Sequence, residues 1–115
     1  MSVPTLLVVS HSPSNRLALP RVPLLPACRV IVVSSWERAV ARDLLEPVRV
    51  VVSDSVTFTR DRELTKASLE ALGAGVVLVL GLGAVTRWAR ELNVESVDRI
   101  GYPTRVLSSL TPVPV

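Results

Sequence analysis

The chain has 115 residues, the length of one domain, and its 49% apolar and 20% charged composition is globular rather than disordered. The net charge of +3 comes from 13 basic and 10 acidic residues that are interspersed along the chain, which argues against charge-driven nucleic-acid binding. With one cysteine, Cys28, and one histidine, His11, the chain can form neither an internal disulfide nor a cysteine-based zinc cluster. The uncharged run 71–86 is too short and too glycine-rich to span a membrane, and no secretory signal precedes it. We therefore expect a cytoplasmic protein without a membrane partner.

Four apolar runs have the length and composition of strands: Thr5–Ser10, Arg29–Ser34, Val48–Ser53 and Val76–Gly81. Each is rich in Val, Ile or Leu, is continuous rather than alternating, and ends in Ser or Gly. Continuous β-branched runs are typical of strands that are buried on both faces of a parallel sheet.

Helical patterns follow three of these runs. Ser35 is placed to cap a helix over 36–45, and Asp61 to cap one over 62–72 that ends at Gly73. A third helix is expected over 84–92, ending at Asn93 in a left-handed conformation. The residues expected to face the core are Trp36, Ala39, Val40, Leu44, Leu64, Ala67, Ser68, Ala71, Leu72, Val85, Trp88, Ala89 and Leu92.

The remaining segments are less regular. Four prolines in 13–26 leave no room for a long helix, so this connection is an extended arm, a loop with one turn around 15–19, or a contact surface. Residues 97–100 and 105–107 fit short edge strands, and 111–115 fit a loose tail. We predict a single domain over 1–115: a three-layer, Rossmann-like α/β fold with a mostly parallel sheet of four to five strands and helices on both faces.

Ligands of open parallel sheets bind outside the carboxyl ends of the strands. At those ends this chain carries small or hydroxylic residues, which allow a close approach of backbone N–H groups to an anion. The same residue types are also common in the turns that connect strands to helices, without any role in binding. His11 and Asp54 are the candidate catalytic groups, with a solvated loop histidine and a helix cap as their structural alternatives. Cys28 is interpreted as a small apolar filler, and no metal site is predicted.

The region 48–103 resembles a known family. The segments VRVVVSDSVTFTRDREL, KASLEAL, VVLVLGLGA and RWARELNV occur in the order found in the YspA-like branch of the SLOG superfamily. These are Rossmann-like domains related to the DNA-processing protein DprA and to the LOG phosphoribohydrolases.

The resemblance implies a nucleotide site made by two loops. The family's Gly-Ser-Arg turn falls on Asp54, Ser55 and Val56, where only the serine matches, and Thr57 begins the matching Thr-Phe-Thr helix start. The second glycine-rich loop falls on 81–84 and is several residues shorter than the family's. An aspartate in place of the glycine adds a side chain and a negative charge where the family holds phosphate, which opposes anion binding at that position.

Three functions are compatible with these features. The first is a domain that binds a nucleotide or a nucleotide-derived, ADP-ribose-like ligand in a sensing or regulatory role, without a required cofactor. The second is a ligand-free interaction module, with a homo-oligomer as the expected assembly. The third is a hydrolase of glycosidic bonds, phosphoribohydrolase-like or DNA glycosylase-like, that uses Asp54 or His11. The residues predicted to bind the ligand are Ser10, Ser53, Ser55, Thr57, Arg60, Gly81, Gly83, Ala84 and Arg87.

Overall fold

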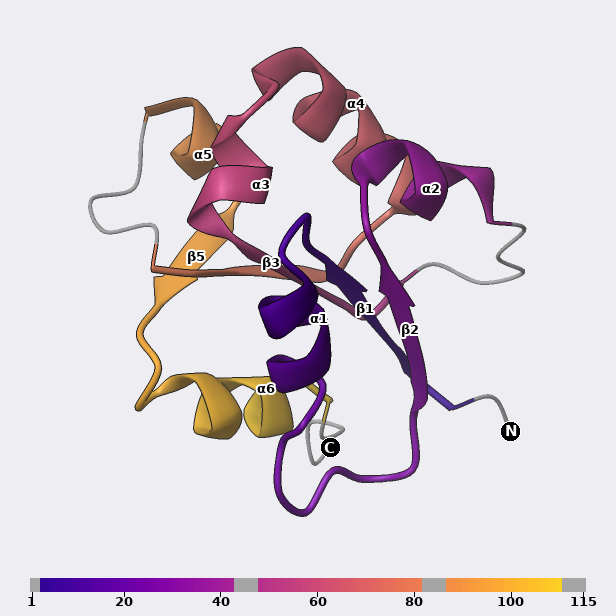
Figure 1. Cartoon of the computed structure of the whole chain (residues 1–115), viewed down its shortest axis with the longest axis vertical. Helices are drawn as coiled ribbons and strands as arrows, with labels where there is room; N and C mark the ends of the chain where they lie inside the picture. Colours follow the sequence, from indigo (N-terminus) through magenta and orange to yellow (C-terminus); the bar gives the residue numbers. More distant parts are fainter. Residues whose placement is uncertain (1–2, 43–47, 82–86, 111–115) are drawn as a thin grey trace.

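A parallel sheet forms the centre of the computed structural model, which describes residues 3–42, 48–81 and 87–110, without the side chains of 87 and 88. Its strands are β1 (Thr5–Val9), β2 (Arg29–Val33), β3 (Val50–Asp54), β4 (Val76–Leu80) and β5 (Val94–Val97). They pair in the order β2-β1-β3-β4-β5, and every pair is parallel (Figure 1). This is the flavodoxin-like order of doubly wound sheets, in which the direction of winding reverses between β1 and β3.

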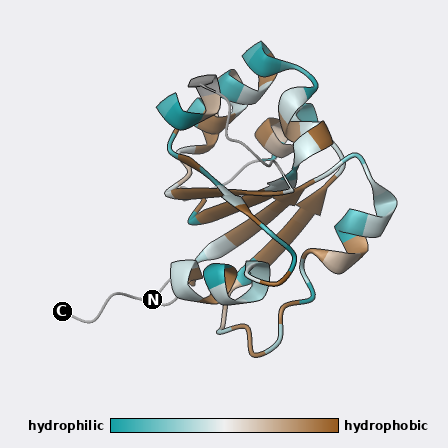
Figure 2. Ribbon diagram, turned by 90° about the vertical axis from the view of Figure 1, so that its left-hand side faces the viewer, coloured by the Kyte–Doolittle hydropathy of each residue, from teal (hydrophilic) through white to brown (hydrophobic). Residues whose placement is uncertain are grey.

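Helices cover both faces of the sheet, which confirms the predicted three-layer α/β class. One face carries α2 (Trp36–Ala41), α3 (Ser55–Thr59), α4 (Arg62–Leu72) and α5 (Arg87–Glu91), and the other carries α1 (Pro13–Ala18) and α6 (Tyr102–Leu110) (Figure 1). Alternate residues of the central strands pack into two cores, so that in β1 Leu7 and Val9 pack on the first face while Leu6 and Val8 pack on the second. Figure 2 shows these apolar strands enclosed between more polar helices.

The predicted helix boundaries rest on local hydrogen bonds. The Ser35 hydroxyl accepts a hydrogen bond from the backbone N–H of Arg38 at 3.2 Å, and Asp61 Oδ1 accepts one from that of Leu64 at 3.1 Å. Gly73 ends α4 with φ 61°, and Asn93 has φ 56°, so both adopt the expected left-handed conformation. In the proline-rich connection, the turn expected around 15–19 is found as the six-residue helix α1.

The prediction for the end of the chain was wrong in two places. The last strand covers Val94–Val97 rather than 97–100, and residues 105–107 lie in α6 rather than in a strand. The buried side chains of α6 are Tyr102, Val106 and Leu110, which repeat every four residues as a helix requires. A prediction based on the short apolar run inside this segment overlooks that longer period.

Several side chains also face differently from the prediction. Val40 of α2 is 39% exposed, and Ala67 and Ala71 of α4 are exposed while Thr65 and Leu69 are buried instead. Strand β2 is not buried on both faces, because it forms an edge of the sheet and its Val30 and Val32 are 40% and 39% exposed. The predictions for 43–45, 82–86, the Trp88 side chain and the tail 111–115 lie outside the described residues.

A buried hydrogen bond from a tyrosine hydroxyl joins helix α6 to the rest of the fold. The Tyr102 hydroxyl donates a hydrogen bond to the Leu19 carbonyl oxygen at 2.6 Å, and the two side chains are 6% and 3% exposed. Burial raises the pKa of Tyr102 far above its ordinary value, so the phenol stays neutral and keeps its proton for this bond. No helix in the described part of the chain has the length and apolar character needed to cross a membrane.

Replacing Tyr102 by phenylalanine tests the contribution of this hydrogen bond to stability. Y102F leaves the Leu19 carbonyl oxygen buried without its partner, so we expect the free energy of unfolding to fall by about 1–3 kcal/mol in urea titrations. The control is S14A, which removes an exposed hydroxyl of α1 and is expected to change stability by less than about 0.5 kcal/mol. Equal stability of Y102F and wild type would show that the hydroxyl does not hold α6.

Candidate functional site

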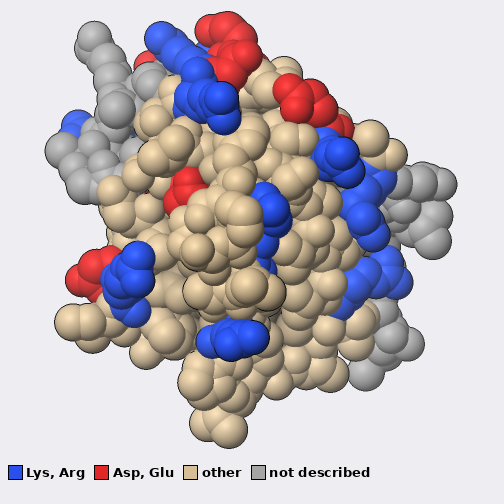
Figure 3. All heavy atoms as spheres, in the orientation of Figure 1, with Lys and Arg blue, Asp and Glu red and all other residues tan. Residues whose placement is uncertain are grey.

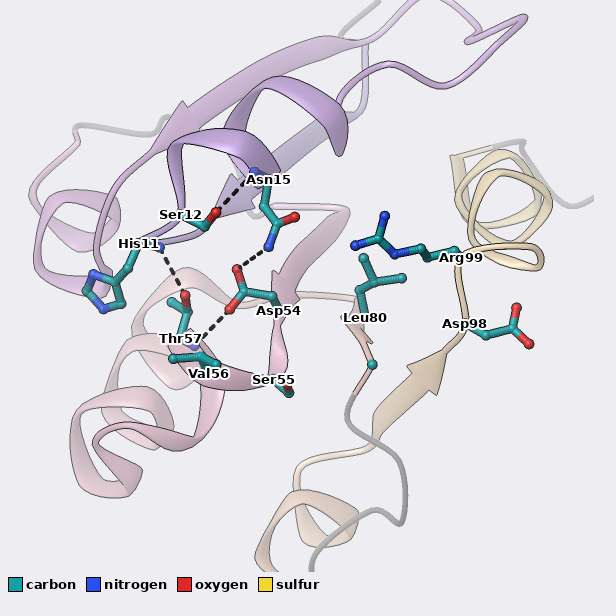
Figure 4. A pocket seen from close by; sticks show the side chains of 11 residues that line it. His11, Ser12, Asn15, Asp54, Ser55, Val56, Thr57, Leu80, Asp98 and Arg99 are labelled. Carbon is teal, nitrogen blue, oxygen red and sulfur yellow. Dashed lines mark hydrogen bonds between the residues drawn. The ribbon is translucent and has the colours of Figure 1, made fainter.

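The carboxyl ends of four strands meet around one cavity. A cavity of about 730 Å³ is lined by residues that end or follow β1, β3, β4 and β5: His11, Ser12, Asn15, Asp54, Ser55, Val56, Thr57, Leu80, Gly81, Asp98 and Arg99 (Figure 4). The cavity therefore lies at the point between β1 and β3 where the winding of the sheet reverses. Ligands of open α/β sheets bind at this position, and the volume falls within the range of small-molecule pockets.

Asp54 is the organising side chain of this edge. One carboxylate oxygen, Oδ1, accepts a hydrogen bond from the Thr57 backbone N–H at 2.8 Å and so caps α3. The other, Oδ2, accepts hydrogen bonds from the Ser10 hydroxyl and from the Asn15 side-chain amide, the latter at 3.0 Å. One carboxylate thus joins the end of β1, helix α1 and the start of α3.

The pKa of Asp54 reflects a balance between burial and these bonds. Burial opposes the charged form and raises the pKa, whereas the hydrogen bonds from Ser10, Thr57 and Asn15 stabilise the carboxylate. The bonds prevail, and the pKa of Asp54 lies below its ordinary value. Asp54 is therefore an ionised cap, which is the structural alternative named for it above.

The loop after β1 is held by further polar contacts. The Arg16 guanidinium donates to the carbonyl oxygens of Ser10 and His11 at 2.9 and 3.1 Å, and the His11 backbone N–H donates to Thr57 Oγ1 at 3.0 Å. In Figure 4 the His11 ring points away from the Arg99 side of the cavity. His11 also lines a second cavity, of about 470 Å³, beside α2, α3 and α4.

One cationic side chain enters the first cavity without a partner. The Arg99 guanidinium extends toward Leu80 in Figure 4, and it makes no hydrogen bond or ion pair with any residue that the structure describes. Asp98 is turned the other way, and its Oδ1 accepts the Gly101 backbone N–H at 2.6 Å. Over the face shown in Figure 3, basic and acidic side chains are interspersed.

The predicted site residues fall into three groups. Ser55, Thr57 and Gly81 line the first cavity, and Arg60 lines the second. Ser10 and Ser53 are fully buried beneath the edge, with their hydroxyls bonded to Asp54 and to the Val9 carbonyl oxygen. Outside the described residues are Gly83, Ala84 and the side chain of Arg87.

Sequence reasoning missed Asn15, Val56, Leu80 and Arg99. Arg99 was missed because the last strand was predicted over 97–100, although an end at Val97 would have placed Arg99 at the carboxyl edge of the sheet. Asn15 could have been predicted from the sequence. The Ser12-Pro13 pair is typical of a helix start, and the first turn of that helix places Asn15 over the end of β1. Cys28 packs against the second core, as predicted, and burial raises the pKa of its thiol.

In the described part of the chain, no three His, Cys, Asp or Glu side chains lie close enough together to hold a metal ion. Comparisons with family models, with curated proteins and with solved structures found no significant match to the chain.

The role of Asp54 predicts a pH dependence of stability. Because the pKa is lower in the folded state than the unfolded value of 3.8, the ionised carboxylate stabilises the fold above that pH. This contribution is lost as the pH falls through the folded-state pKa. We expect D54N to be less stable than wild type at neutral pH by about 1–3 kcal/mol, and to lose less further stability upon acidification, as measured by urea unfolding from about pH 6 to about pH 3.

The matched control is E70Q, which removes an exposed carboxylate of α4. It is expected to resemble wild type at neutral pH. If D54N lost stability upon acidification as steeply as wild type, the carboxylate would not be the group that holds this edge together.

Proposed function

We propose that the protein is a small regulatory or sensing domain that binds a nucleotide-type ligand at the carboxyl edge of its sheet. The observation that carries this proposal is the cavity of about 730 Å³ at the β1/β3 reversal, open to solvent and bordered by residues from four strand ends. Such a position is where doubly wound sheets bind their ligands.

The lining of the cavity supports a ligand with an apolar, flat part and an anionic part. Val56, which is 68% exposed, and the half-buried Leu80 offer apolar surface for a base. Arg99, which has no partner among the described residues, offers a planar guanidinium that suits a phosphate or carboxylate. Around them, the hydroxyls of Ser12 and Ser55 offer hydrogen bonds.

The resemblance to the SLOG superfamily remains a part of this proposal. The two loops that the resemblance assigns to ligand binding contain Ser55 and Gly81, and both residues border the cavity. The position of the missing glycine is occupied by Asp54, whose charge caps α3. An anion is therefore expected on the Arg99 side of the cavity rather than at the start of α3.

Binding is favoured over hydrolysis by the state of the carboxylates. A hydrolase of glycosidic bonds needs a carboxylate that is free to exchange a proton or to attack. Both carboxylate oxygens of Asp54 already accept hydrogen bonds from the protein. The Asp98 side chain points away from Asp54 in Figure 4. For this reason we favour ligand binding over hydrolysis of a glycosidic bond as the function of this domain.

A thermal-shift panel of AMP, ADP, NAD and ADP-ribose tests the proposal. A ligand present at 100 times its Kd stabilises the fold by about 2.7 kcal/mol, so we expect a rise of about ten degrees in Tm for at least one of them. R99Q is expected to abolish the shift, whereas R21Q, which removes an exposed charge beyond α1, is expected to keep it. No shift with any ligand at millimolar concentration contradicts the proposed function.

A second candidate function is an interaction module that pairs with another copy of the chain through β2. This edge strand leaves one backbone edge unpaired in the described sheet and exposes Val30 and Val32 on one face. Nearby, the loop that leads into β2 carries Leu24, which is 91% exposed and held at φ 61°, a strained conformation for leucine. Antiparallel pairing of two β2 strands about Ile31 would bring Val30 of each copy opposite Val32 of the other.

Light scattering on a sizing column tests this candidate. We expect wild type to have the mass of a dimer and V32K to have the mass of a monomer, since a charged side chain at the edge opposes strand pairing. The matched control is V40K on α2, where the native valine is equally exposed, at 39%. A monomeric wild type, or equal masses for V32K and V40K, would remove β2 as the interface.

A further inference from the structure

One exposed leucine is held in a conformation that leucine rarely adopts. Leu24, in the loop between α1 and β2, has a φ of 61° and a side chain that is 91% exposed. The left-handed region favours glycine or asparagine, and for a bulky side chain it is a strained outlier. Burial of the side chain within the chain does not offset this strain. Backbone outliers of this kind cluster at functional sites, and exposed apolar side chains at contacts with partners.

The loop presents Leu24 on a rigid frame. Prolines at every third position of 20–26 restrict the backbone on both sides of it. Val22 is buried in the second core, and the half-buried Leu25 packs against that core. Because the loop is fixed in place before a partner arrives, burying Leu24 in a contact requires little further ordering, which lowers the entropic cost of binding.

Leu24 and the first cavity lie at opposite ends of the sheet. All strands of the described sheet run parallel, so the loop that leads into the start of β2 is at the amino edge, whereas the cavity is at the carboxyl edge (Figure 1). A strand of five residues spans about 17 Å, so Leu24 cannot reach the cavity of its own chain. Leu24 of a second copy can reach it, and there it meets apolar surface from Val56, which is 68% exposed, and from Leu80.

We propose that the chain associates head to tail, with Leu24 of one copy inserted into the first cavity of the next, against Val56 and Leu80. The two surfaces differ and lie at opposite ends of the molecule, so each copy offers both, and the contact builds short open chains rather than a closed dimer. A nucleotide in the cavity displaces this leucine, so ligand binding and association exclude each other. The exclusion rests on the proposed function, whereas the docking of Leu24 needs no ligand.

Sedimentation velocity over a range of protein concentrations tests the association. All proteins in this experiment carry V32K, so that pairing through β2 does not contribute. Because one loop buries little area, we expect the mass to rise to at least twice that of the monomer only at high protein concentration. L24N should remain a monomer and keep its fold, since asparagine tolerates the left-handed conformation. The matched control, L17N, makes the same change at a leucine of α1 that is 65% exposed and should associate like the parent.

A mixing experiment tests the direction of the contact. V56D places a carboxylate in the wall of the cavity and should also be a monomer by itself, although its Leu24 is intact. An equimolar mixture of L24N and V56D then contains one intact cavity and one intact loop, so it should form a one-to-one dimer and nothing larger. Saturating ADP should return this dimer to monomers.

The possible failures are distinguishable. A parent that is a monomer at every concentration, association that L24N leaves unchanged, or a mixture that stays monomeric would overturn the docking of Leu24 and leave the nucleotide site standing. If ADP binds L24N in calorimetry but leaves the dimer of the mixture intact, Leu24 docks outside the cavity and the proposal is overturned. If ADP does not bind but the mixture forms its dimer, the proposed function fails while the docking of Leu24 stands.

Discussion

The hydrogen-bonded carboxylate of Asp54 is the group on which the carboxyl edge of the sheet depends. It stands at the end of a central strand and takes hydrogen bonds from Ser10 below it, from Asn15 of α1 and from the first turn of α3. Three segments that are distant in the sequence are thereby fixed around one charge. The bonds outweigh the cost of burial and hold the pKa of Asp54 below its ordinary value, so the group stays ionised at neutral pH. An ionised, fully bonded carboxylate is suited to hold a site open rather than to exchange protons.

The two cavities follow from this arrangement. With α3 capped by Asp54, its Thr57 stands beside the loop after β1 and, together with His11, lines both cavities. The larger cavity opens on the side of β4 and β5, and the smaller one on the side of α2 and α4. Each contains one unpartnered arginine among the described residues, Arg99 in the first and Arg60 in the second.

Much of the fold could be predicted from the sequence because its signals are local. The four apolar runs, the caps at Ser35 and Asp61 and the stop at Gly73 depend on residues within a few positions of each other, and the structure confirms them. Strand order and the exposure of β2 depend on long-range pairing, which no short pattern encodes. The same limit applies to the site. Ser55 and Gly81, which line the first cavity, were predicted from their places at the ends of strands, and Thr57 from the family resemblance. Arg99 was missed because the end of β5 was misplaced by three residues.

The most direct test of the central claim, that the carboxyl edge is a ligand site, is a two-dimensional ¹H–¹⁵N NMR titration of the chain with ADP. The account predicts that the largest shift changes fall on the backbone amides of Thr57, Gly81 and Arg99, which line the first cavity on three different strand ends. The amides of Val30 and Val32 at the β2 edge should remain in place. Changes confined to the β2 edge, or no changes at millimolar ADP, would contradict the account.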